Sequence, residues 1–139
     1  MDKTRVLELL KKNGLCVLAT ANKVGKTEAA VMAYVIKDDF TILIFTDEGT
    51  RKYKNLLENN LVSIVVGGLK DDPETQIDGT VKILEGEEVK AAENFAFAVH
   101  PEWKDYVSAT TKWLEVKPNW LRFTDFSKSP PEIVEITEW

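Results

Sequence analysis

The sequence predicts a mainly β protein in which about seven antiparallel strands close into a barrel and about three to four helices pack outside it. Two observations predict this class. Short segments rich in β-branched, aromatic and other apolar residues recur along the chain, and most connections between them are too short for a crossover helix. The chain has 139 residues, the length of one domain, and so long a sheet in so small a domain is completed most easily by closing on itself. We therefore expect residues 1–139 to form a single domain.

The first elements follow from apolar spacing and turn residues. Apolar residues at positions i, i+3 and i+4 predict an amphipathic helix over residues 2–12, which ends at Asn13-Gly14. Residues 15–21 are almost continuously apolar and too short for a buried helix, so we expect a strand that is covered on both faces. After a turn at residues 22–25, a second strand is expected over residues 26–37.

The middle of the chain continues this pattern. Asp38-Asp39 separates the second strand from residues 40–46, which are β-branched and aromatic, so the two strands are expected to form a tight hairpin. A helical stripe of apolar residues begins after Gly49 and stops at Asn59-Asn60. Residues 61–66 are again typical of a strand.

The last part of the chain combines strands with a longer helical segment. Residues 75–84 alternate between polar and apolar, which predicts a strand with one face in water or against a polar pocket. Residues 87–112 have a helical pattern in two pieces that is broken at His100-Pro101. Two final strands are expected over residues 120–126 and 133–137.

The composition excludes several classes of function. A single cysteine forbids an internal disulfide, and a single histidine is too few for a zinc site of the Cys/His type, so we expect no metal site. A net charge of −5 has the wrong sign for a protein that binds phosphodiester backbones, so we expect no nucleic-acid partner. The sequence has neither a secretory leader nor an apolar run long enough for a membrane span, which indicates a soluble, cytoplasmic protein.

Cys16 and His100 are both expected to be structural. Cys16 lies in an apolar strand, where burial makes a thiol inert. His100 precedes Pro101, a favoured first helical residue, so we expect it to connect two helices. A nucleophilic pair of Cys16 and His100 would require the fold to bring the two residues together.

The start of the second helix carries two cations in an unfavourable position. Thr50 is the natural N-cap, which places Arg51 and Lys52 in the first turn, where the helix dipole already makes the backbone positive. An anion such as a phosphate would be received there by free N–H groups, the threonine hydroxyl and both basic side chains. The alternative is that Asp47 and Glu48 screen the two charges and the basic side chains lie in solvent.

The second strand is unusually rich in small residues. Ala29, Ala30 and Ala33 are poor strand formers and leave the backbone accessible around Val31 and Met32. A flat aromatic ligand could lie against such a surface. The alternative is that the small residues accommodate another helix or strand.

Four segments of the sequence together carry a family resemblance: GLCVLATANKVGKTEAAVMAYV, FTILIFT, TRKYKNLLENNLVSIVV and TQIDGTVKIL. The most specific part is a strand that ends in Phe45-Thr46, followed after three residues by Thr50-Arg51-Lys52. This spacing is similar to the aromatic-Thr-(three residues)-Ser-Arg-Lys pattern of the pyridoxamine 5'-phosphate oxidase-like family, whose members adopt the FMN-binding split barrel. The similarity covers roughly residues 4–86, with a weaker echo at residues 118–126.

The resemblance implies an antiparallel split barrel of about six to seven strands that binds FMN. Carried over, the phosphate ligands would be Thr46, Thr50, Arg51 and Lys52. The isoalloxazine ring would lie against the backbone of residues 31–33, namely Val31, Met32 and Ala33, and a glutamine on a later strand points to Gln76. In relatives the cofactor lies at a two-fold interface, so a homodimer is implied.

The sequence also departs from the family pattern. True pyridoxamine-phosphate oxidases carry an arginine and a lysine where Ala30 and Val35 stand here, and the chain's end, PPEIVEITEW, lacks the family's substrate-binding Arg and His. Gln76 lies closer to Gly79 than the pattern expects. The resemblance thus supports a flavin-binding split barrel and argues against vitamin B6 oxidation, as for an orphan member of the family.

The leading hypothesis is a small FMN-dependent oxidoreductase of unknown substrate, in which a nicotinamide donor is possible and no residue stands out as a general acid or base. The alternative is a binding or carrier protein that holds FMN, haem or another anionic ligand on the same barrel without turnover. A deazaflavin is a third possibility, because features that hold a phosphate do not identify the ring.

Overall fold

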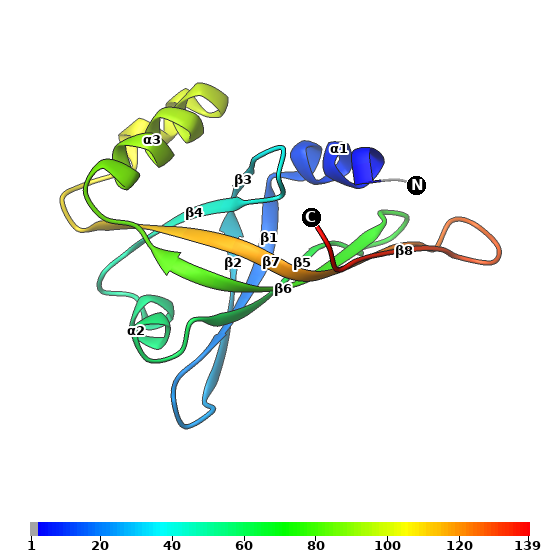
Figure 1. The fold of residues 1–139 in the computed structure, drawn as a ribbon, viewed down its shortest axis with the longest axis horizontal. Helices are drawn as coiled ribbons and strands as arrows, with labels where there is room; N and C mark the ends of the chain where they lie inside the picture. Colours follow the sequence, from blue (N-terminus) through cyan, green and yellow to red (C-terminus); the bar gives the residue numbers. More distant parts are fainter. Residues whose placement is uncertain (1–2) are drawn as a thin grey trace.

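The computed structural model describes residues 3–139 and shows a mainly β fold with helices outside the sheet (Figure 1). The predicted first helix included residue 2, which lies outside the described residues. The elements in chain order are α1 (Lys3–Asn13), β1 (Leu15–Ala21), β2 (Thr27–Ala33), β3 (Val35–Ile36), β4 (Ile42–Asp47), α2 (Arg51–Glu58), β5 (Leu61–Gly67), β6 (Glu74–Ile83), α3 (Glu87–Val99), the 3₁₀ turn η1 (Pro101–Asp105), β7 (Thr111–Asp125) and β8 (Glu132–Ile136).

The strands form one curled antiparallel sheet. Its order is β2-β1-β5-β6-β7-β4-β3, and β8 adds to β7 beside this path. Strands β2 and β3 stand at the two ends of that order, yet only Tyr34 separates them in the chain. The sheet therefore closes on itself, which confirms the predicted split barrel. The second strand, predicted as one piece over residues 26–37, is divided between the two ends of the sheet at Tyr34.

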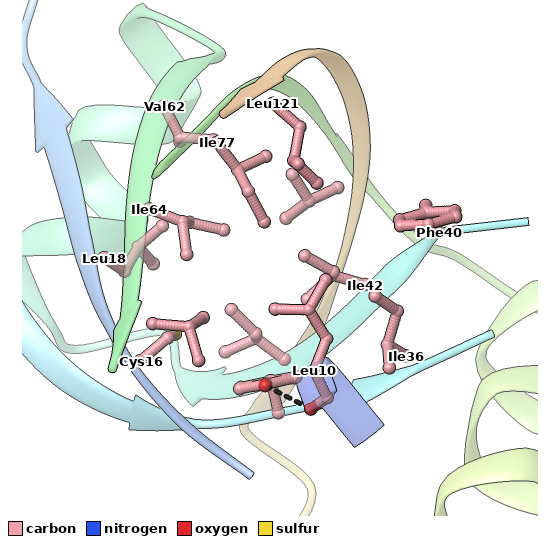
Figure 2. Close-up of a cluster of buried hydrophobic side chains, with 14 of the residues drawn as sticks. Leu10, Cys16, Leu18, Ile36, Phe40, Ile42, Val62, Ile64, Ile77 and Leu121 are labelled. Atoms are coloured by element: carbon pink, nitrogen blue, oxygen red, sulfur yellow. Dashed lines mark hydrogen bonds between the residues drawn. The ribbon is translucent and has the colours of Figure 1, made fainter. Parts of the chain in front are cut away.

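The barrel interior is filled by alternate side chains of its strands and by the apolar face of α1. Because side chains alternate across a strand, each strand sends every second residue inward. The O–H of Tyr34 donates to the backbone carbonyl of Leu10, which ties α1 to the junction of β2 and β3. Figure 2 shows the interior cluster, which includes Leu10, Cys16, Leu18, Ile36, Phe40, Ile42, Val62, Ile64, Ile77 and Leu121.

A second apolar cluster joins α3 and η1 to the outside of the barrel. Trp113 on β7 is buried, lies 5.3 Å from Phe45 between ring centroids, and donates from its indole N–H to Glu93 at 3.0 Å. Ala92 and Ala96 present the buried face of α3 to this cluster. The helix therefore covers β3, β4 and the start of β7.

The prediction for residues 106–112 and for the start of β7 is wrong. The predicted helical segment ended at residue 112 and the strand began at residue 120, but η1 ends at Asp105 and β7 already begins at Thr111. Pro118, which cannot donate to a sheet, lies opposite Gly79 where the register with β6 shifts. A Cβ on Gly79 would meet the carbonyl oxygen of Lys117 at 2.8 Å, so the close approach at this bulge requires glycine.

The predicted coverage of β1 on both faces is also wrong. The bounds of β1 match the prediction, but Leu15 and Val17 are exposed while their neighbours point into the barrel. In a closed sheet only one face meets the interior, and α3 covers another part of the outside (Figure 1), whereas α2 adds Leu56 to the interior cluster. None of the helices within residues 3–139 has the length and apolarity that a bilayer crossing needs.

Candidate functional site

The turn from β4 to α2 forms the centre of the candidate site. Thr50 has extended backbone angles, and its hydroxyl accepts from the backbone N–H of Tyr53 at 3.3 Å, so the predicted N-cap is confirmed. The hydroxyl oxygens of Thr46 and Thr50 lie 3.1 Å apart. The N–H groups of Arg51 and Lys52 belong to the first turn and have no carbonyl partner within the helix. Two hydroxyls and the helix start thus converge at the end of β4.

Arg51 and Lys52 differ in burial, but neither side chain donates a hydrogen bond within residues 3–139. The side chain of Arg51 is 78% exposed and that of Lys52 is 14% exposed. Among the side-chain hydrogen bonds within residues 3–139, none is donated by either residue, so their donors are free for a ligand.

The two acidic residues expected to screen these cations have other partners. The carboxylate of Asp47 accepts from the N–H of Gly49 at 2.8 Å and from the Thr110 hydroxyl, and these bonds hold the pKa of Asp47 below its ordinary value, the Thr110 bond most. Glu48 lies 3.8 Å from the ammonium of Lys112. Neither carboxylate forms an ion pair with Arg51 or Lys52, so the predicted screening is not seen, whereas Arg51 does lie in solvent as that alternative expected and Lys52 does not.

The acid that faces the two cations comes from β2. Oε2 of Glu28 lies 3.8 Å from Nε of Arg51, and Oε1 lies 4.0 Å from Nζ of Lys52. Glu28 was not among the site residues predicted from the sequence. The available signal was its position as the one charged residue of β2, among alanines and apolar side chains.

Strand pairing and helix packing bring Glu28 to the start of α2. Glu28 lies opposite Thr20 of β1 in the antiparallel register. The hydroxyl of Thr20 accepts from the side-chain amide of Asn55 on α2 at 3.0 Å. At the other end of the helix, Glu58 accepts from the N–H of Lys23 in the β1–β2 turn at 3.1 Å. The middle and the C-terminal end of α2 are thus fixed to the β1–β2 hairpin.

A family model described as pyridoxamine 5'-phosphate oxidase matches residues 3–125. The chain belongs to the pyridoxamine 5'-phosphate oxidase family. No curated protein matches the chain.

Several solved structures have a fold similar to that of this chain. A protein of unknown function from Agrobacterium tumefaciens is 22% identical with a TM-score of 0.77; the match covers 86% of this chain and 55% of that one, so the chain spans about half its length. A heme binding protein from Mycobacterium smegmatis is 14% identical with a TM-score of 0.79, over 99% and 58% of the two chains. A pyridoxamine 5'-phosphate oxidase-related, FMN binding protein from Nostoc punctiforme is 10% identical with a TM-score of 0.70, over 98% and 96%. At these identities the likeness shows the fold.

Two departures from the family pattern have structural counterparts. Ala30 lies on the same face of β2 as Glu28, so the strand offers a carboxylate and a methyl group there instead of a cation. Val35 is buried in the cluster beneath α3, where a charged side chain would lose its solvation. The position of Val35 is therefore adapted to apolar packing, and that of Ala30 leaves room beside the Glu28 carboxylate.

The residues expected to contact a ring lie on an open strand edge. β2 pairs only with β1, so among the described residues the backbone groups on its other edge have no strand partner. Val31 points outward and is 68% exposed, whereas Met32 packs against the barrel interior. The edge runs from Glu28 beside α2 to Ala33, which joins the phosphate candidates to the ring candidates.

Within one chain, Gln76 lies away from the ring candidates on β2. It lies on β6 in the row Val31, Val17, Val65, Gln76 across four neighbouring strands. Three strand spacings separate it from β2 by about 14 Å. In the sheet of one protomer Gln76 is therefore not a neighbour of the ring candidates on β2.

The outer face of β2, β1 and β5 is apolar and exposed. Leu15, Val17 and Val31 are large hydrophobic residues exposed next to one another on β1 and β2, and Leu61 is exposed at the far end of β5, beyond Ser63. Contiguous apolar patches of this kind mark interaction surfaces. The open edge of β2 borders this face.

Cys16 and His100 have the structural roles expected of them. Burial raises the pKa of the Cys16 thiol to about 12. His100 links α3 to η1, where its backbone N–H donates to Ala96, and its ring stacks on Trp103 outside the barrel. The fold therefore does not bring the thiol and the imidazole together.

Proposed function

We propose that the chain is a single-domain FMN-binding protein that acts as an oxidoreductase and holds the cofactor at a homodimer interface. The observation that carries the proposal is the convergence of Thr46, Thr50 and two cations with free donors at the start of α2. First-turn N–H groups, hydroxyls and basic side chains form the donor set that a phosphate monoester accepts from. Family membership and the FMN binding neighbour support the same cofactor.

The residues present fit the phosphate end of FMN. The Thr50 hydroxyl accepts from Tyr53 and donates to the backbone carbonyl of Asp47 at 2.9 Å, and its oxygen lies beside that of Thr46. Lys52 is mostly buried, so the fold itself positions the Thr46 hydroxyl and the Lys52 ammonium, and the Thr50 hydroxyl joins them when it turns from Asp47 to the phosphate. Arg51 is exposed and can close over the phosphate from the solvent side. Glu28 is the acid that faces both cations, and its charge opposes an anion there.

The ring would lie along the open edge of β2 at Val31, Met32 and Ala33. The backbone groups of this edge can hydrogen-bond the polar rim of the isoalloxazine, and the apolar outer face can exclude water from it. Bound FMN supplies hydride or electron transfer at its ring. Because Gln76 is too far away within one protomer, we propose that it contacts the cofactor bound by the partner across the dimer interface.

The first experiment is a titration of the purified protein with FMN and with riboflavin, followed by flavin fluorescence and by mass spectrometry of ligand released from native protein. We expect micromolar or tighter FMN binding and weaker riboflavin binding, because riboflavin lacks the phosphate. Absence of FMN binding at micromolar concentration would overturn the proposal. Release of a deazaflavin would be consistent with the proposed phosphate site and would show that the bound ring is a deazaflavin and not FMN.

The oxidoreductase part is tested separately. With FMN bound, addition of NADPH or NADH under anaerobic conditions is expected to reduce the flavin and bleach its absorbance. A supplied electron acceptor should then reoxidise the flavin and sustain repeated oxidation of the nicotinamide. Bound flavin that neither nicotinamide nor other small-molecule donors reduce would contradict a catalytic role.

A second candidate function is a carrier for haem or another anionic ligand on the same barrel. The heme binding neighbour from Mycobacterium smegmatis favours it, with a TM-score of 0.79 over 99% of this chain. A carrier would bind haem with a Soret shift and would not turn over. His100, the one histidine of the sequence, is the candidate axial ligand. An unchanged Soret band in His100→Ala would show that His100 does not ligate the haem iron.

A further inference from the structure

Glu28 carries an unusual oxygen. Within residues 3–139, Oε2 of Glu28 is the one buried side-chain oxygen or nitrogen without a hydrogen-bond partner. The side chain is only 9% exposed. Buried carboxylates in proteins are normally hydrogen-bonded or closely paired, so this atom requires a structural explanation.

Arg51 and Lys52 lie next to Glu28 but do not donate hydrogen bonds to its carboxylate. The separations of 3.8 Å to Arg51 and 4.0 Å to Lys52 exceed the roughly 2.7–2.9 Å of a charge-assisted hydrogen bond. Their attraction to Glu28 is therefore electrostatic, and their N–H donors are not used by it. The carboxylate offsets the unfavourable interaction of two cations with the positive end of α2.

No other acid shares this position. Glu48 faces Lys112, Asp47 is held by Gly49 and Thr110, and Glu58 caps the N–H of Lys23 at the far end of α2. The register neighbour of Glu28 on β1 is Thr20, which is uncharged. The cluster at the helix start therefore consists of two cations and one buried anion.

We propose that Glu28 is a specificity-determining residue that limits the strength of phosphate binding at the start of α2. The inference rests on the proposed function, since it places the FMN phosphate between Arg51 and Lys52. A phosphate dianion that reaches both cations meets the Glu28 carboxylate as a like charge in a partly buried site, where repulsion is weakly screened. Glu28 also competes with the phosphate for the same two cations.

This arrangement gives the site a definite selectivity. The ring and the ribityl chain supply most of the flavin affinity, and the phosphate adds less than its donor set would otherwise provide. Free inorganic phosphate, which has no ring, is held weakly and does not block the site. FMN is then an exchangeable ligand of this protein.

The test compares Glu28→Gln with wild-type protein and with Glu48→Gln. The glutamine keeps the shape of Glu28 and removes its charge, and Glu48→Gln removes the same charge from a residue that pairs with Lys112. Dissociation constants are measured for FMN and riboflavin by fluorescence, and for inorganic phosphate by amide shifts of Thr50–Tyr53. Thermal unfolding confirms that each variant is folded, and Glu28→Ala provides a second variant without the charge.

We expect Glu28→Gln to bind FMN and inorganic phosphate at least about tenfold more tightly than wild type, because a like charge has been removed. Riboflavin binding and Glu48→Gln should not change. Equal or weaker FMN and phosphate binding in Glu28→Gln would overturn the proposal. If Glu28→Gln tightens phosphate binding while no variant binds either flavin, the role of Glu28 stands and the proposed function fails.

Discussion

Arg51 and Lys52 are the single residues whose loss tests the phosphate site most simply. Their donors are free and Thr50 lies beside them, so each is expected to form a charge-assisted bond to the phosphate. The double variant Arg51→Ala/Lys52→Ala should bind FMN about a hundredfold or more weakly, since each such bond contributes about 1.5–3 kcal/mol. Riboflavin affinity, measured by the same fluorescence titration, should stay the same.

Lys54→Ala is the matched control for this prediction. Lys54 is exposed on α2, beyond the first turn, so its loss should leave FMN affinity unchanged. The double variant leaves the buried Glu28 carboxylate without its cations, and adding Glu28→Gln should restore thermal stability but not FMN binding. Equal FMN affinity in wild type and the double variant would show that the phosphate lies elsewhere.

Cys16 makes a residue-scale prediction about pH. Burial raises the pKa of its thiol from 9.0 to about 12, so the folded protein keeps the proton over a range in which the unfolded chain loses it. The free energy of unfolding should therefore fall as pH rises from 9.0 toward 12, because the unfolded state binds fewer protons there. Burial also raises the pKa of Tyr34, so Cys16→Ala should remove only part of the slope.

Thiol labelling checks the same prediction near neutral pH. At pH 8 a disulfide reagent should react with Cys16 only after urea is added, because the thiolate is the reactive form and burial suppresses it. Rapid labelling of the native protein would contradict the burial of this thiol in the barrel.

At the scale of single residues, what the sequence reveals depends on how far apart the partners are in the chain. The order Thr46, Thr50, Arg51, Lys52 is local, so spacing alone predicted the cap and the first-turn cations. Glu28 reaches that cluster only through the β1–β2 register and the packing of α2 on β1. Such a contact has no local signature, which is why its role could not be predicted.

At the scale of elements, the cap of α2 is expected to stabilise both the helix and the site. Thr50→Ala removes the hydroxyl that accepts from Tyr53, which should lower the free energy of unfolding by about 1 kcal/mol. Thr50→Ser keeps the oxygen and should be close to wild type. Urea unfolding measures both, and an equal loss in Thr50→Ser would show that the methyl group, not the hydroxyl, stabilises the turn.

Strand β7 shows where element prediction failed. Lys117-Pro118-Asn119 has the composition of a chain break, and the segment before it continues a helical pattern. The structure accommodates Pro118 at a bulge opposite Gly79, so a strand of 15 residues passes through it. Trp113 is then buried beneath α3, and Leu114 and Val116 are buried in the barrel interior. Tertiary burial overrode the local pattern in this segment.

At the scale of the whole molecule, the exposed face of β2, β1 and β5 is expected to be the dimer interface. Val31→Glu places a charge opposite Val17, on the β2 side of this face, and should convert the dimer to a monomer, since an unpaired buried charge costs several kcal/mol. FMN affinity should fall with it. Val24→Glu, at an exposed position in the β1–β2 turn, is the control and should stay dimeric. A dimeric Val31→Glu would contradict this placement of the interface.

The closed sheet was predictable in outline because its strands are short, successive and mostly joined by turns. The division of the second strand at Tyr34, which joins the two ends of the sheet, could not be predicted. Residues 27–36 have one continuous strand-like pattern in the sequence, with no turn residue at Tyr34. The exposed outer face of β1 was also missed. A strand whose sequence is apolar on both faces is consistent either with a covered sheet or with a second copy of the chain.

Sedimentation velocity recorded at a flavin wavelength tests for a cofactor site at the dimer interface, because it reports binding and assembly together. We expect FMN to sediment with a species of twice the 15.7 kDa chain mass, at one flavin per chain. Flavin that stays at the meniscus, or that sediments with a single chain, would contradict a cofactor site at a dimer interface.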